Sequence, residues 1–165
     1  MTRQGIEVDG DVDLVERFHA GSLGPEDLAC LRFRAGPEEP WAPHPQVAFV
    51  REVIDPPAPL PGADLRWQQV LVGSPCGDLR LWHHFVAGRR VASAFGDIGD
   101  PDVTTTMRYD AVLGLMDGTS ETLEAFEVGG HIAGEWSAML LLLGISEQPE
   151  FVAAMRRSIG TLGPG

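Results

Sequence analysis

Residues 102–118 read DVTTTMRYDAVLGLMDG, and their periodicity changes partway along. The first half is rich in β-branched residues, which pack well in a pleated strand. The second half places apolar side chains at helical spacing, and Gly118 closes it with a residue that suits a left-handed helix end. We therefore predict a strand over 102–107 that passes directly into a helix over 109–117.

Three further strands are predicted upstream of this segment. Apolar and polar side chains alternate there with a period of two, and glycine-containing turns separate the runs. The predicted strands cover 65–72, 79–86 and 90–95. On the second strand Leu79, Leu81 and Phe85 share one face. We expect this face to turn inward, with Arg80 outside, because it carries more aliphatic surface than the face with Trp82 and Val86.

Apolar helices dominate the chain after residue 118. We expect a helix over 119–128, a short strand over 130–134 between glycines, a helix over 135–143 and a last helix over 149–159. The helix over 135–143 is apolar on nearly every side, so we expect burial on more than one of its sides. One of its faces carries Trp136, Met139, Leu140 and Leu143. That face either packs into the core or lines a cavity for an apolar ligand.

The first 62 residues differ in composition from the rest of the chain. They are predicted to form a helical and Pro-rich extension to a domain over 63–165. Residues 1–12 are polar and acidic and are expected to be irregular. Helices are predicted over 13–18, 25–33 and 45–54, and Pro-rich connections over 36–43 and 56–62 separate them.

The composition excludes several classes of partner. The chain of 165 residues has a net charge of −12, and 44% of its residues are hydrophobic. Such a chain can bury a core, and its negative charge repels phosphate backbones, so no nucleic acid is expected as a partner. The first ten residues lack the apolar core of a signal peptide, and the longest apolar run is too short to span a bilayer. We expect a cytoplasmic protein without stable membrane insertion.

The sequence contains no recognisable catalytic motif, and we expect no catalytic residue, no metal and no cofactor. His83 and His84 are adjacent in a predicted strand, so their rings point to opposite faces and cannot chelate one metal side by side. Cys76 lies in a turn without a basic neighbour, so we expect no reactive thiol. An enzyme that acts on a hydrophobic substrate, with His83, His84 or His131 as general base, is kept as an alternative.

Five short motifs follow one another in the C-terminal half. They are DVTTT at 102–106, LGLMDG at 113–118, EAF at 124–126, GHIAGE at 130–135 and MLLLL at 139–143. This ordered series resembles the sterol carrier protein 2 (SCP2-like) family, and the hairpins over 65–98 fit the same family by pattern alone. The resemblance implies an α+β fold in which helices cover a five-stranded, mostly antiparallel sheet, with a hydrophobic tunnel between the two layers.

The resemblance also implies a function and a site. It implies non-catalytic binding or carriage of a sterol, fatty acid, acyl-CoA or related lipid. The ligand-binding residues that it implies are Trp136, Met139, Leu140, Leu143, Phe126, Met116, Leu81 and Phe85. The chain departs from the family at His131, where a basic residue is common, and in its long extension. An alternative is an interaction module with a vestigial pocket, in which residues 1–62 dock a partner enzyme or form a homodimer.

Overall fold

A five-stranded sheet forms the centre of the molecule, and the fold class is α+β. The computed structural model describes residues 6–116, 119 and 129–160. The strands are β3 (Leu65–Ser74), β4 (Gly77–Val86), β5 (Arg89–Phe95), β6 (Val103–Arg108) and β7 (His131–Gly134). Their order is β5-β4-β3-β6-β7, and every neighbouring pair is antiparallel except β3 and β6. All five strands lie within two residues of the predicted bounds.

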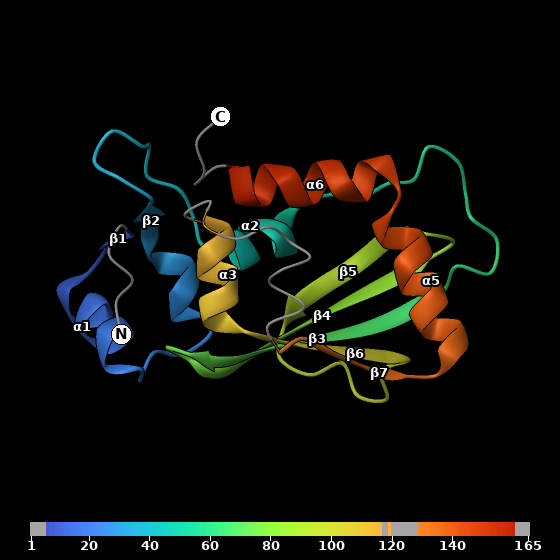
Figure 1. The fold of residues 1–165 in the computed structure, drawn as a ribbon, viewed down its shortest axis with the longest axis horizontal. Helices are drawn as coiled ribbons and strands as arrows, with labels where there is room; N and C mark the ends of the chain where they lie inside the picture. The colour runs from blue at the N-terminus through green and yellow to red at the C-terminus, as the bar shows by residue number, and fades with distance from the viewer. Residues whose placement is uncertain (1–5, 117–118, 120–128, 161–165) are drawn as a thin grey trace.

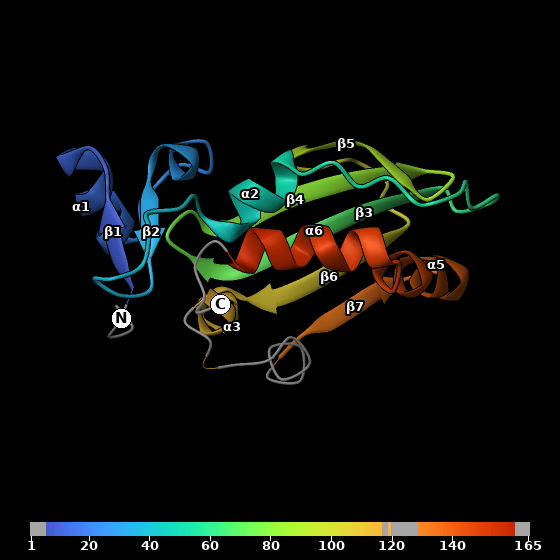
Figure 2. The same cartoon turned by 90° about the horizontal axis from the view of Figure 1, so that it is seen from above.

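Helices lie on one side of this sheet. They are α2 (Pro45–Arg51), α5 (Trp136–Ser146) and α6 (Pro149–Gly160), and α3 (Tyr109–Met116) follows β6 without an intervening residue (Figures 1 and 2). This direct passage from strand to helix is the one predicted from the change in periodicity. The helix predicted over 119–128 lies outside the described residues. Within the described residues, no single helix is both long and apolar enough to cross a membrane; α5 and α6 pass that test only as a pair, bent by 73° at their junction.

The covered face of the sheet is the face predicted from β4. Leu79, Leu81 and Phe85 have no exposed surface, whereas Arg80 is exposed. The core on this face divides into two apolar clusters. The first cluster contains Leu81 and lies toward the N-terminal segment, that is, the described residues up to position 62. The second cluster contains Phe85 and lies toward α5 and α6. Three buried polar residues separate the clusters along the strands: Gln69, His83 and Thr105.

A short crossover makes β3 and β6 parallel neighbours. Residues 96–102 lead from β5, at the edge of the sheet, past β4 and β3 to β6. The Gln68 amide oxygen accepts from the Ile98 amide at 3.0 Å, and the Arg66 guanidinium donates to the carbonyls of Ile98 and Asp100, each at 3.0 Å. Polar side chains of β3 therefore satisfy backbone groups of the crossover that have no ladder partner.

The N-terminal segment differs from the prediction in two places. Residues expected to be irregular form β1 (Glu7–Asp9), which pairs antiparallel with β2 (Arg32–Arg34). The helix expected over 25–33 is reduced to a 3-10 turn at Asp27–Cys30, and β2 replaces its second half. Phe33 explains the difference, because period two along β2 buries its ring fully in the first cluster.

The N-terminal segment shares its core with the sheet. Phe18 on α1 (Val12–Ala20) and Phe33 on β2 pack in the same cluster as Leu71 and Leu81 of the sheet. The rings of Phe18 and Phe33 meet edge to face, with centroids 5.5 Å apart. Residues on the N-terminal side of position 62 therefore contribute directly to the core of the sheet domain.

Gly134 is required where β7 meets β6. Its φ is +150°, and a Cβ at this position would lie 2.4 Å from the Asp102 carbonyl oxygen. Gly134→Ala is expected to lower the free energy of unfolding by about 2 kcal/mol, because backbone must move to admit the methyl group. Urea unfolding measures this loss. Gly144→Ala on α5 is the matched control: beyond the adjacent residues and the neighbouring helix backbone, no atom lies within 4 Å of its Cβ position, so a gain of roughly 0.5–1 kcal/mol is expected. Equal stabilities of the two variants would contradict the prediction.

Candidate functional site

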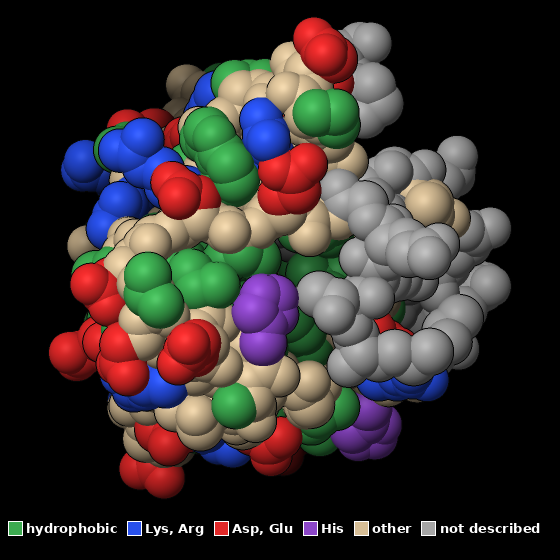
Figure 3. Space-filling model, turned by 90° about the vertical axis from the view of Figure 1, so that its left-hand side faces the viewer, with side chains coloured by type: hydrophobic (Ala, Val, Ile, Leu, Met, Phe, Trp, Pro, Cys, Tyr) green, Lys and Arg blue, Asp and Glu red, His purple; other side chains and the backbone are tan. Residues whose placement is uncertain are grey.

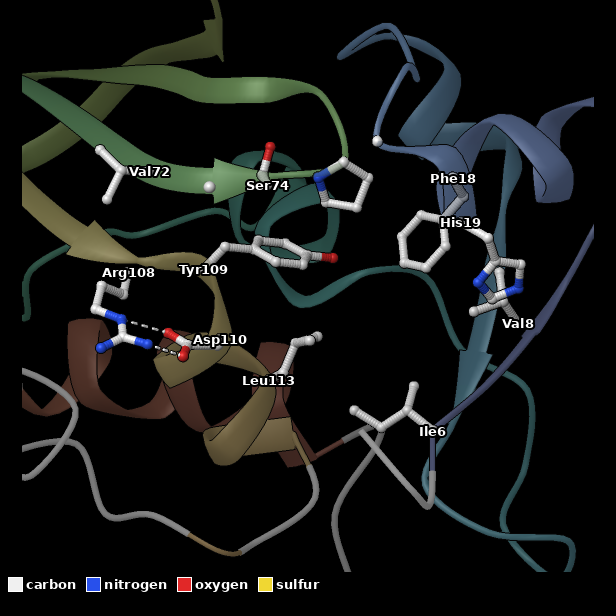
Figure 4. A pocket seen from close by; sticks show the side chains of 13 residues that line it. Ile6, Val8, Phe18, His19, Val72, Ser74, Arg108, Tyr109, Asp110 and Leu113 are labelled. Atoms are coloured by element: carbon white, nitrogen blue, oxygen red, sulfur yellow. Dashed lines mark hydrogen bonds and ion pairs between the residues drawn. The ribbon is translucent and has the colours of Figure 1, made fainter. Parts of the chain in front are cut away.

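An open cleft lies where β3 ends and α3 begins, beside β1 and α1 (Figures 3 and 4). Its volume is about 450 Å³, which is within the range of roughly 300–1,000 Å³ that small-molecule sites occupy. Hydrophobic side chains form the bottom of a hollow at this end of the molecule (Figure 3). The apolar lining residues are Ile6, Val8, Phe18, Val72 and Leu113, and the main polar ones are His19, Ser74, Arg108, Tyr109 and Asp110.

The apolar walls come from segments far apart in the sequence. Ile6 and Phe18, from the N-terminal segment, face Leu113 and Tyr109 of α3 across the cleft (Figure 4). β1 carries Val8 of this wall and is held in place by its pairing with β2. The cleft therefore depends on the small N-terminal sheet, which the sequence analysis did not predict.

Tyr109 is a polar residue of the cleft lining that is fixed by a buried hydrogen bond and by ring stacking. Its hydroxyl lies 3.1 Å from Nε2 of His44, and the two rings stack with centroids 5.6 Å apart. His44 has no exposed surface and precedes α2, where its Nδ1 accepts from the Gln46 amide at 3.1 Å. Because Nδ1 is an acceptor, the proton of the neutral ring lies on Nε2, and Nε2 donates to the Tyr109 oxygen.

Burial keeps both members of this pair neutral. It lowers the pKa of His44 from 6.5 to about 3, because no counter-charge compensates the desolvation of the imidazolium. Burial also raises the pKa of Tyr109 far above its ordinary value, and the nearby Cys76 adds to this shift. The sequence analysis missed both residues. The available signals were a histidine directly before the proline that starts α2, which is a capping position, and the single tyrosine of the chain.

An ion pair lies at the polar side of the cleft. The Arg108 guanidinium donates to Asp110 through Nε at 2.9 Å and through Nη2 to the second carboxylate oxygen (Figure 4). Both side chains are about half exposed. Each charge is compensated by the other, so the cleft offers no unpaired cation at this position.

The predicted residues of α5 lie away from the cleft. Trp136, Leu140 and Leu143 are 72%, 49% and 51% exposed, and Met139 is partly buried against the second cluster. The side of α5 that packs on the sheet carries Ala138, Leu142 and Ile145. The helix is thus buried on one side and open on the other, which corrects the expectation of burial on more than one side.

The other predicted site residues are distributed over both clusters. Leu81 and Phe85 share the covered face, but Leu81 belongs to the first cluster and Phe85 to the second. Met116 ends α3, the helix whose Leu113 lines the cleft. Phe126 lies outside the described residues. Of the predicted residues whose side chains the structure describes, none lines the cleft, and the role of all eight in binding stays a prediction.

The three histidines considered as general bases lie outside the lining of the cleft. His83 is fully buried beside Trp67 and Phe49, and burial, reinforced by the Arg90 guanidinium, lowers its pKa well below 6.5. His84 is partly buried on the opposite face of β4, and His131 is exposed on β7. Burial raises the pKa of the Cys76 thiol to about 11, which keeps it protonated at neutral pH.

No protein-family model and no curated protein matches this chain. Several solved structures align with parts of it. The sterol carrier protein domain 2 of Helicoverpa armigera is 17% identical, with a TM-score of 0.39, over 58% of this chain and 69% of that one. A conserved hypothetical protein of Thermus thermophilus, described as a candidate sterol carrier protein, is 13% identical, with a TM-score of 0.42, over 74% and 79%.

The third structure is the stereoselective inverting sec-alkylsulfatase Pisa1 from a Pseudomonas species. It is 14% identical, with a TM-score of 0.34, over 63% of this chain and only 14% of its own length. Two of these three structures thus carry the name of the family that the sequence resembles.

Proposed function

We propose that the chain binds a hydrophobic small molecule of the lipid class in the cleft between α1, β1 and α3, and that it carries this ligand without catalysing a reaction. The observation that supports the proposal is a cleft of about 450 Å³ with apolar walls and the neutral Tyr109 hydroxyl between them. Burial of an acyl chain would drive binding, at about 0.8 kcal/mol for each methylene removed from water. About fifteen methylenes would supply about 12 kcal/mol, which offsets an association cost of about 4 kcal/mol and leaves the roughly 8 kcal/mol of micromolar affinity.

The state of the buried histidines supports a non-catalytic role. A general base needs a pKa near the working pH and must reach the substrate proton. His44 is next to the cleft, but its pKa of about 3 and its donating Nε2 make it a poor base. His83 is enclosed by the second cluster. His19 lines the cleft on α1 and is the residue to replace if turnover of a ligand is ever observed.

The test starts with native mass spectrometry of the freshly purified protein, followed by solvent extraction and uptake of acyl and sterol probes. Leu113→Trp fills the cleft from α3 and is expected to weaken uptake at least about 10-fold, because overpacking removes the space for the ligand. Trp136→Asp and Leu140→Asp test the wall implied by the resemblance. Both side chains are exposed, so these variants are expected to fold.

The outcomes separate the two locations. Loss of uptake in Leu113→Trp alone supports the cleft, and loss in the two α5 variants alone supports the predicted wall. A clean apo mass with no uptake of any probe by the wild-type protein would contradict the proposed function.

A second candidate function is self-association through α5. Trp136, Leu140 and Leu143 are spaced by four and three residues, so they form one exposed apolar stripe. Such a stripe suits packing against the same helix of a second copy. The native mass spectrum that detects the ligand also gives the oligomeric state, and a monomer at micromolar concentration would count against this candidate.

A further inference from the structure

The Tyr109 hydroxyl does not donate its proton to His44. Nδ1 of His44 accepts from the Gln46 amide, so Nε2 is the donor in the contact of 3.1 Å with the hydroxyl. The hydroxyl oxygen is then the acceptor, and its own O–H remains available to donate. Of the described residues, His44 provides the one hydrogen-bond contact to this hydroxyl.

The surroundings fix the position of the Tyr109 oxygen at the cleft. Tyr109 is only 4% exposed, and its ring is stacked on His44, which fixes the direction of the hydroxyl. In Figure 4 the hydroxyl points from α3 toward Phe18, into the space between the two walls. Ser74 is a second hydroxyl in the lining, but its proton is already donated to the Gly77 carbonyl at 2.7 Å.

The charges around the cleft favour a neutral acceptor over an anionic one. Arg108, the cation in the lining, is bonded twice to Asp110. A carboxylate placed at Tyr109 would be desolvated without an unpaired cation, in a chain with a net charge of −12. A ketone, ester or ether oxygen accepts the same hydrogen bond without that penalty.

We infer that the ligand of this cleft is an apolar molecule with a neutral oxygen acceptor, and that Tyr109, oriented by His44, donates the hydrogen bond that selects it. The inference rests on the proposed function, because it assigns the chemical class of the ligand for the same cleft. Tyr109 is a specificity-determining residue in this account, and His44 is a positioning residue that acts through it.

Three probes of matched chain length test the inference: 2-tridecanone, tridecane and tridecanoate. Their affinities are measured by competition with a fluorescent acyl probe. The wild-type protein is expected to bind the ketone about 10-fold more tightly than the alkane, which is the size of one net hydrogen bond. Tyr109→Phe is expected to remove this preference, so that the ratio of the ketone affinity to the alkane affinity falls about 10-fold.

Ser74→Ala is the matched control, since it also removes a lining hydroxyl, and it is expected to keep the preference for the ketone. A measurement on the wild-type protein does not depend on the folding of any variant. The carbonyl stretch of bound, ¹³C-labelled 2-tridecanone is expected at lower frequency than in alkane solvent, and His44→Phe is expected to change that shift.

Two results would overturn the inference while leaving the proposed function intact. One is equal preference for the ketone in the wild-type protein and Tyr109→Phe, with an unshifted carbonyl stretch. The other is tightest binding of tridecanoate. Failure of all three probes to bind would overturn the proposed function and this inference together.

Discussion

Replacing Arg90 by methionine is expected to lower the free energy of unfolding by about 4 kcal/mol. Arg90 is a strand residue whose side chain is only 7% exposed and reaches α2. Its Nη2 donates to the carbonyl of Phe49 at 2.5 Å and also to the carbonyl of Glu52. Both carbonyls lie at the C-terminal end of α2, where the Phe49 carbonyl also accepts from the Glu52 amide at 3.3 Å. The guanidinium also lies 4.8 Å from the centre of the Phe49 ring.

The magnitude follows from what the substitution leaves behind. Loss of the guanidinium costs about 1–3 kcal/mol at each carbonyl, with the cost at Phe49 toward the lower end because that carbonyl keeps the Glu52 amide. The cation–π contact contributes about 1 kcal/mol more. Methionine removes the desolvation cost of the guanidinium, a cost visible in the lowering of the pKa of Arg90 to about 10 by burial. The carbonyls belong to the backbone and cannot be replaced, so the loss exceeds this gain.

Urea unfolding of Arg90→Met measures the effect, and hydrogen exchange locates it at α2. The adjacent Arg89 provides the control, because its ion pair with Asp55 is exposed on both sides at 2.6 Å. Arg89→Met is expected to cost less than about 1 kcal/mol. If the two variants unfolded at the same urea concentration, the hydrogen bonds from Arg90 of β5 to the α2 carbonyls would not contribute to stability, and the prediction would be wrong.

Lowering the pH from 7.5 to 5.5 is expected to cost about 3 kcal/mol of stability. His44 and His83 are fully buried, and burial lowers the pKa of His44 to about 3 and that of His83 well below 6.5. In the unfolded chain both rings bind a proton near pH 6.5. The unfolded state therefore binds more protons below that pH, and stability falls as the pH falls toward the folded pKa values.

Each neutral buried histidine contributes about 1.4 kcal/mol to this difference between the two pH values. Urea unfolding at pH 7.5 and pH 5.5 gives the total, and His44→Phe is expected to reduce it by about half. Tyr109→Phe is the control, since His44 stays buried in it and the pH dependence is expected to persist. Equal stability of the wild-type protein at the two pH values would contradict the assigned protonation states.

Local sequence pattern was sufficient for the five strands of the central sheet and for its covered face. Alternation with a period of two, β-branched composition and flanking glycines are all local features, so β3 to β7 and the inward side of Leu79, Leu81 and Phe85 were predicted correctly. The same holds for the passage from β6 to α3, where the period changes within one residue. Pattern failed at β2, because Phe33 is extended only through its pairing with Val8 of β1 and its bridge to Ala42.

The candidate site was less accessible to prediction. Its walls come from Ile6, Phe18, Val72 and Leu113, and no local period relates these positions. The apolar character of α5 was evident from its residues, but because nearly every position is apolar, the sequence did not indicate which side of the helix faces the sheet. Contact with Trp67, Phe85 and Val103 of the sheet buries Ala138 and Leu142, and it leaves Trp136 exposed.

Composition and short-range period therefore account for the class of the fold, the positions of the strands and the apolar character of the C-terminal helices. The long-range contacts account for the strand pairing at the N-terminus, the open side of α5, the neutral His44–Tyr109 pair and the cleft. The reason is physical. Periodicity records which residues of one segment share a face, whereas the depth of burial of a side chain depends on which distant segment covers that face.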